Sequence, residues 1–398
     1  MRRWILLGVM AAVALTAHAA KRVTVAELIQ AVTTDSAAHK PDAEIIRQIS
    51  AMELTERLSE ATLDRLNAQV QLSPQVALAL ELQADQSAFL DLPVSELPAL
   101  PPPGEDAQLK TFNAAGTFVA ETLPHLPNFL ATRTTIQYDD SPQEVKKGSW
   151  PVRAGLHLVG KLSRDTSVSA ERTGTSAGGA QGASQQGGLV SWGEFGSVLG
   201  MVLADSANGK VSWSHWEQLA GVRAAVFHYT VPKAASHFEV VNSIRREAGI
   251  EGFATHMDGS RIAGIGARQN NSSSQTSVIH ADRGYQGSLW VDPATGSILR
   301  VTIEANSKDS SAFQWAEMMV EYGPVEIGGG TFILPVRSVA FSRTILSTDA
   351  MTGSAPSQWL NETLFNNYHR FVGTTRILTD ADAAPAPHKP ADSESKPQ

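Results

Sequence analysis

A serine between two glycines is the first candidate for chemistry in this chain. Gly174, Ser176 and Gly178 fit G-x-S-x-G, in which serine hydrolases hold their nucleophile in a strained turn between a buried strand and a helix. Here the residues before the motif are polar, and a segment rich in Gly, Ser, Ala and Gln continues to residue 188. A flexible loop cannot hold an oxyanion site in place, so we interpret the match as chance and keep hydrolysis by Ser176 as a third hypothesis.

Histidines are the second candidate, since they could hold a metal. The chain has 11 of them, and none falls in an H-E-x-x-H pattern or in a tight cluster with carboxylates. His215, His228 and His237 lie on neighbouring predicted strands and could meet in space. We expect hydrogen-bonded strand histidines, with no metal and no cofactor.

Aromatic residues recur on successive predicted strands. They have two interpretations: the wall of a cavity for an acyl chain or an apolar peptide, or ordinary core between a sheet and a helix. A fatty-acyl chain gains roughly 0.8 kcal/mol per buried CH₂, which is enough for micromolar binding after association losses. The candidate ligand-binding residues are Trp213, Trp216, Phe227, Tyr229 and Trp290.

The N-terminal part carries helix signals. Thr24 and Glu27 form a capping-box pattern, and Ser73 followed by Pro74 marks a later helix start. We predict a helical subdomain over residues 20–90 and a proline-rich linker over residues 91–106. The prolines of the linker are Pro93, Pro98, Pro101, Pro102 and Pro103.

The remainder changes from helix to strand. Periodic apolar residues predict helices over residues 109–123 and 195–203, and residues 266–277 are expected to be a polar loop. The clearest hairpin covers residues 285–304, with Asp292, Pro293 and Gly296 in its turn. Strands are predicted over residues 129–138, 157–170, 210–218, 222–231, 237–241, 317–322, 331–346 and 361–377. Because strands do not alternate with helices, the pattern predicts an α+β fold with an antiparallel sheet.

The first 19 residues resemble a cleavable export signal. Arg2 and Arg3 precede a short apolar run, and Ala17-His18-Ala19 fits a signal-peptidase site. The run is shorter than the roughly 20 residues of a spanning helix, so we expect cleavage near Ala19 and no transmembrane segment in the mature chain. The predicted location is the periplasm or the medium. Absence of cysteine excludes disulfides, thiol catalysis and a lipid-anchored cysteine.

Composition limits the partners. The net charge is −8, without basic runs, which argues against nucleic acid and anionic membranes. Charged residues make up 18% and hydrophobic residues 42% of the chain, so most of it should fold. Residues 379–398 are rich in proline and lack large apolar residues, and they are predicted to form a disordered tail.

Two segments resemble a known superfamily. Residues 290–300 (WVDPATGSILR) are similar to the W-[IV]-D-x-x-T-G-x-[IL]-x-[RK] hairpin of the outer-membrane lipoprotein-sorting (LolA/RseB-like) superfamily. Residues 322–327 (YGPVEI) with 332–335 (FILP) resemble its Y-x-x-V-x-[IV]-G-x-x-x-[IL]-P strand pair. Residues 53–59 (ELTERLS) look like the N-terminal helices of exported bacterial proteins that carry both parts. The resemblance implies a strongly curved antiparallel half-barrel closed by helices, over residues 107–378.

The resemblance and the aromatic strands lead to two functional hypotheses. The first is an exported, non-enzymatic binding protein that takes a hydrophobic ligand or a lipoprotein in a half-barrel cavity. The second is an envelope module that interacts with another protein or senses stress, which the two-part architecture and the proline linker suggest. In either case the mature protein would act as a free carrier or sensor.

Overall fold

The computed structural model describes residues 21–139, 161–168, 188–189, 194–247, 266–268, 274–282, 284–306, 313–344 and 358–370. The predicted signal peptide, Ser176, nearly all of the glycine-rich insert and the C-terminal tail lie outside these residues. No helix in the described part of the chain is long and apolar enough to cross a membrane.

The N-terminal region consists of four helices and two short strands. Its capping box is confirmed, because the Thr24 side chain accepts from the backbone of Glu27 while the Glu27 carboxylate accepts from the Thr24 N–H. Ser73 caps the fourth helix ahead of Pro74, as its sequence indicates. The elements are β1 (Lys21–Val23), α1 (Val25–Ala37), α2 (Asp42–Ser50), β2 (Met52–Leu54), α3 (Glu60–Val70) and α4 (Pro74–Gln86). Strands β1 and β2 pair in parallel, and apolar side chains of this region form a core of their own.

The proline-rich segment after α4 leads into a long helix. It contains one short 3₁₀ turn, η1 (Val94–Glu96). Helix α5 (Glu105–Thr122) follows and continues into η2 (Leu123–His125). The prolines therefore stand where no regular hydrogen-bond ladder needs their missing N–H.

A nine-stranded antiparallel sheet forms the main body, which confirms the predicted α+β class. The spatial order is β4-β3-β15-β14-β13-β12-β11-β7-β6, so the sheet is open and β4 and β6 are its edges. Its half-barrel curvature stays a prediction. The strands are β3 (Phe129–Asp139), β4 (Lys161–Val168), β6 (Lys210–Leu219), β7 (Val222–Val231), β11 (Tyr285–Val291), β12 (Ile298–Asn306), β13 (Phe313–Ile327), β14 (Gly330–Thr344) and β15 (Gln358–Arg370).

A second, four-stranded sheet was not expected. Its order is β5-β8-β10-β9, formed by β5 (Gly188–Leu189), β8 (Glu239–Glu247), β9 (Gly266–Arg268) and β10 (Ser274–Asp282). The prediction of a loop over residues 266–277 is therefore wrong. Strand β10 begins with the polar run Ser274-Gln275-Thr276-Ser277, and such polar segments depend on pairing with a neighbour, here β8, more than on their own composition.

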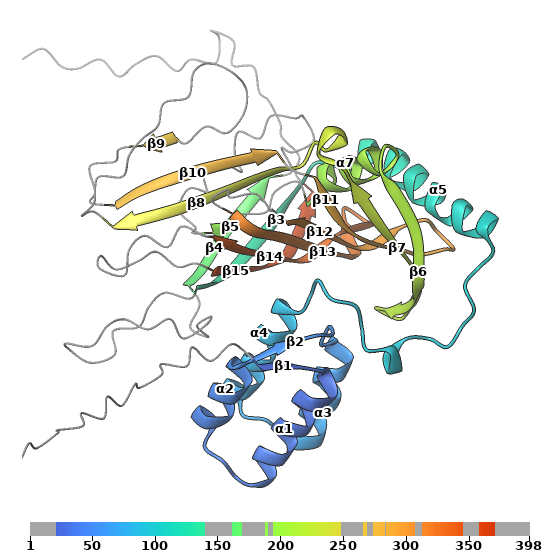
Figure 1. Ribbon diagram of the computed structural model, residues 1–398. Coiled ribbons are helices and arrows are strands. Elements are labelled where there is room, and N and C mark those ends of the chain that lie inside the picture. The colour runs from blue at the N-terminus through green and yellow to red at the C-terminus, as the bar shows by residue number, and fades with distance from the viewer. Residues whose placement is uncertain are drawn as a thin grey trace, which may run out of the picture.

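Helices cover both faces of the large sheet (Figure 1). Helices α5 and α7 (Ser197–Ser206) lie on one face, where their side chains join those of β7, β11, β12 and β13 in the main core. The N-terminal helices lie on the opposite face, where Leu82 and Ala88 pack against Met319, Val339 and Leu360. Because strand side chains alternate between faces, consecutive residues such as Met318 and Met319 belong to different cores.

Candidate functional site

The five predicted aromatic residues divide between the two faces of the sheet. Phe227 and Tyr229 are buried on the α5/α7 face, and Trp213 and Trp216 pack against the same cluster. Trp290 lies on the other face, in a cluster with Val226 and Leu299. The register explains the division, because Leu289 pairs with Phe227 and the next residue, Trp290, pairs with Val226.

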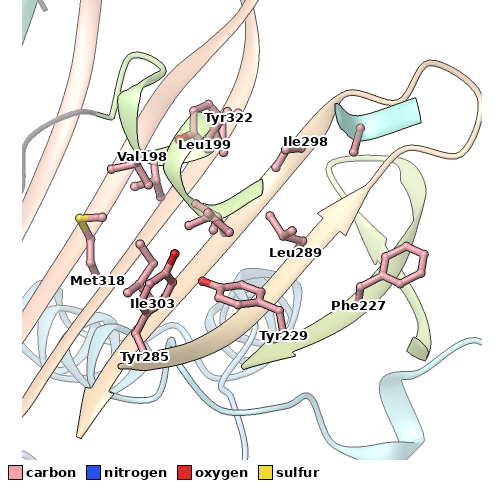
Figure 2. Close-up of a cluster of buried hydrophobic side chains, with 14 of the residues drawn as sticks. Val198, Leu199, Phe227, Tyr229, Tyr285, Leu289, Ile298, Ile303, Met318 and Tyr322 are labelled. Atoms are coloured by element: carbon pink, nitrogen blue, oxygen red, sulfur yellow. The ribbon is translucent and has the colours of Figure 1, made fainter. Parts of the chain in front are cut away.

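On the α5/α7 face the rings contact one another edge to face. The ring centroids of Trp213 and Phe227 lie 5.7 Å apart, and those of Phe112 and Phe227 lie 5.6 Å apart. Tyr229 lies beside Tyr285 and donates a hydrogen bond to the Thr302 carbonyl at 2.5 Å. Figure 2 shows Tyr229 beside Tyr285 among aliphatic side chains that include Val198 and Leu199, with Phe227 to one side. These residues fill a packed core.

Helix α5 packs on this core through Ala115 and Val119 and through the partly buried Phe112 and Phe118. Only Ala115 and Val119 of its 18 residues are buried, and Leu109 is 61% exposed. The helix approaches the sheet closely at the β11–β12 turn, where Gly296 has φ +75° and a Cβ would lie 2.5 Å from the Ala114 carbonyl oxygen. Glycine at this turn is therefore required twice, for its backbone conformation and for contact with the helix.

The opposite face holds a buried ion pair that the sequence patterns did not predict. Arg57, in the loop before α3, pairs with Glu217 of β6. The Trp290 indole N–H donates to the same carboxylate at 2.7 Å. The guanidinium groups of Arg57 and Arg300 lie 5.4 and 5.1 Å from the centroid of the Trp290 ring. Trp290 thus acts as hydrogen-bond donor and as the stacking surface for two arginines.

Two further arginines join the subdomain to the sheet. Arg300 donates to the Ala88 carbonyl at 2.6 Å and to Glu321 at 2.8 Å. Arg337 forms ion pairs with carboxylates from both parts of the protein, namely Asp85, Glu321 and Glu362. Arg57, Arg300 and Arg337 all lie in segments that the sequence patterns single out, but no pattern predicts that the three side chains meet.

Burial and charge shift the pKa values of this network in different directions. Burial raises the pKa of Glu217, but hydrogen bonds from His215 and Trp290 and the charge of Arg57 outweigh it and lower the pKa to about 2. Burial raises the pKa of Asp85 well above its ordinary value despite the charge of Arg337. Burial, followed by the charge of Arg57, lowers the pKa of Arg300. Glu217 is therefore held in its anionic form. For Arg300, the neighbouring carboxylates do not fully offset the effect of burying its charge.

A pocket of about 510 Å³ opens between this network and helices α3 and α4. Arg57 and Arg300 line it, and each is about 95% buried, with exposed fractions of 4% and 5%. Among the described residues, Arg57 Nη1 and Arg300 Nε have no hydrogen-bond partner. None of the five predicted aromatic residues lines this pocket.

Two of the three candidate histidines meet. The Ser214 hydroxyl lies 2.8 Å from His215 Nδ1 and 2.9 Å from His228 Nε2. His215 Nε2 lies 3.5 Å from a Glu217 carboxylate oxygen. His237 is elsewhere, with its Nδ1 2.6 Å from buried Asp205. Within the part of the chain that the structure describes, no group of three potential ligands is placed to hold a metal.

No protein-family model matches the chain, and no curated protein matches it. Among solved structures, a DUF1329 family protein from Desulfovibrio piger is similar over 67% of this chain and 93% of that chain, with 9% identity and a TM-score of 0.24. A likeness at this level does not define the fold or the function. The α+β class stated above therefore rests on the strands and helices of this chain alone.

Proposed function

We propose that the protein is an exported, non-enzymatic binding protein that takes an apolar ligand between helix α5 and the aromatic face of the sheet. The ligand would be an acyl chain, a lipid or a lipidated protein, and the sheet would serve as the half-barrel of the lipoprotein-sorting superfamily. The observation that carries the proposal is the helix itself: α5 lies over the aromatic core but buries only Ala115 and Val119.

The apolar contact that has to be lost when α5 moves comes from one side of the helix. Lifting the helix separates Ala115, Val119 and the partly buried Phe112 and Phe118 from the main core. An incoming acyl chain replaces these contacts, at roughly 0.8 kcal/mol for each buried CH₂. A chain of about 14 to 16 carbons then contributes on the order of 10 kcal/mol before association losses, which supports micromolar binding.

The absence of cysteine supports a carrier that is not anchored to a membrane by a lipid. Cleavage near Ala19 would release the chain into the periplasm without an acylated cysteine to anchor it. N-terminal sequencing of the mature protein tests this part, and an intact N-terminus would overturn it.

The lack of native cysteine also provides a sharp test of ligand binding. A single Phe112→Cys variant can carry an environment-sensitive fluorophore, with Leu109→Cys as a matched control on the same helix. Titration of delipidated protein with a fatty acid should give a saturable change at position 112 and little change at 109, which is already 61% exposed. Absence of saturable binding, or binding without a response at position 112, would sink the proposal.

A further inference from the structure

A continuous row of side chains leads from the surface of the large sheet into the main core. Arg223 of β7 is exposed, and its guanidinium carbon lies 5.3 Å from the centroid of the Trp216 ring. The ring centroids of Trp216 and Trp213 are 4.8 Å apart, and those of Trp213 and the buried Phe227 are 5.7 Å apart. Phe227 in turn contacts Phe112 of helix α5. The row therefore joins an exposed cation to the place where α5 packs on the aromatic core.

Strand register puts the whole row on one face of the sheet. Trp213 pairs with Phe227 across β6 and β7, and Trp216 pairs with Ala225. Arg223 stands two residues before Ala225, so its side chain belongs to the same face and reaches Trp216 diagonally. It is also the second residue of β7, which places it at the turn end of the β6–β7 hairpin. The rings continue from there towards α5.

The charge of Arg223 is not used within the part of the chain that the structure describes. No carboxylate there forms an ion pair with its guanidinium group, and this includes Glu105 and Asp106 in the first turn of α5. The Trp216 ring supports the guanidinium group through its face and leaves the N–H donors available. The ring is itself held in place, because its indole N–H donates to the Pro101 carbonyl at 3.0 Å.

We propose that the apolar ligand is an anionic amphiphile, with its head group on Arg223 and its chain along Trp216 and Trp213 towards the core beneath α5. This inference rests on the proposed function and adds the charge of the ligand to it. A fatty-acid carboxylate and a lipid phosphate share the required chemistry, since both present oxygens that accept charge-assisted hydrogen bonds from a guanidinium group. A neutral head group gains no such contact, and a cationic one is repelled.

Amphiphiles with the same chain and different head groups test the charge of the ligand. The probes are dodecanoate, dodecyl phosphate, dodecanol and dodecylammonium, each titrated below its micelle concentration into the delipidated, labelled Phe112→Cys protein. At least one anion should bind about threefold or more tighter than dodecanol, as expected for an exposed charge pair, and the stronger anion identifies the head group. If neither anion binds more tightly than dodecanol, this inference is wrong and the proposed function stands. Saturable binding of none of the probes would contradict both.

Variants at Arg223, made in the same labelled protein, locate the head group. Arg223→Gln should lower the affinity for the anion to that for dodecanol, because only the charged contact is lost. Arg223→Lys keeps the charge and should retain most of the preference. Arg47→Gln, at an exposed arginine of α2, is the matched control and should bind as the wild type does. A preference that survives Arg223→Gln would show that another cation holds the head group and would contradict the assignment.

Discussion

Arg57 and Glu217, 160 residues apart in the chain, form a buried ion pair that joins the N-terminal helices to the edge strand of the large sheet. The guanidinium group is also stacked on Trp290, and the carboxylate also accepts from the Trp290 indole. These contacts join the loop before α3, the edge strand β6 and the β11–β12 hairpin. They make the N-terminal helices an integral part of the face on which the pocket opens.

Removal of Arg57 should destabilise the protein strongly. Arg57→Ala leaves Glu217 buried without its cation, which costs about 3–5 kcal/mol in the free energy of unfolding. Arg65→Ala is the matched control, because the Arg65 side chain is exposed and its ion pair with Glu96 is long, at 3.8 Å. That change should cost less than about 1 kcal/mol. Urea unfolding measures the loss of stability in both variants. Equal losses would show that the buried ion pair does not stabilise the packing of the N-terminal helices on the sheet.

Acid should weaken the same contact. The folded-state pKa of Glu217 is lowered from 4.5 to about 2, so its stabilisation is complete above pH 4.5 and is lost as the pH falls towards 2. The loss should be on the order of 3 kcal/mol over this window. The free energy of unfolding should therefore fall less steeply between pH 5 and pH 2 for Glu217→Gln than for wild type. Parallel curves would rule out Glu217 as the titrating group.

Trp290 should act through its N–H as well as its ring. Trp290→Phe keeps an aromatic surface for the two arginines but removes a donor to buried Glu217, at a cost of about 1–3 kcal/mol. Losing that donor also raises the pKa of Glu217, so the acid transition should move to higher pH. Trp213→Phe, on the α5/α7 face, is the control and should leave the acid transition in place. A shift of equal size in both variants would disprove the link.

Contact between α5 and the hairpin turn can be tested at Gly296. Gly296→Ala adds backbone strain at φ +75° and places a Cβ against the Ala114 carbonyl. Gly221→Ala is the matched control, since its φ is +80° but nothing lies within 4 Å of the added Cβ. Both variants should lose about 1 kcal/mol from strain, and Gly296→Ala should lose more because α5 must shift. Hydrogen exchange of α5 should rise only in Gly296→Ala; if it rises in neither, the helix does not depend on this contact.

Local patterns predicted most of the regular elements. The capping box at Thr24, the Ser73–Pro74 helix start and the turn at Gly296 are all present, because each depends on a few neighbouring residues. The β8–β10 pairing was missed because polar strands acquire their conformation from a partner distant in sequence. The five aromatic residues all lie on strands, as predicted. The prediction placed Trp290 on one wall with the other four, whereas it lies on the opposite face of the sheet.

The sequence by itself determined most of the helices and the strands of the large sheet, the α+β class and the alternation of side chains along each strand. Those features follow from backbone geometry and from the period of apolar residues. Only the tertiary structure decided which face each strand residue shares with which helix, since that depends on strand register and on packing between distant segments. It therefore separated Trp290 from Phe227, and it brought Arg57, Glu217 and Arg300 to one pocket.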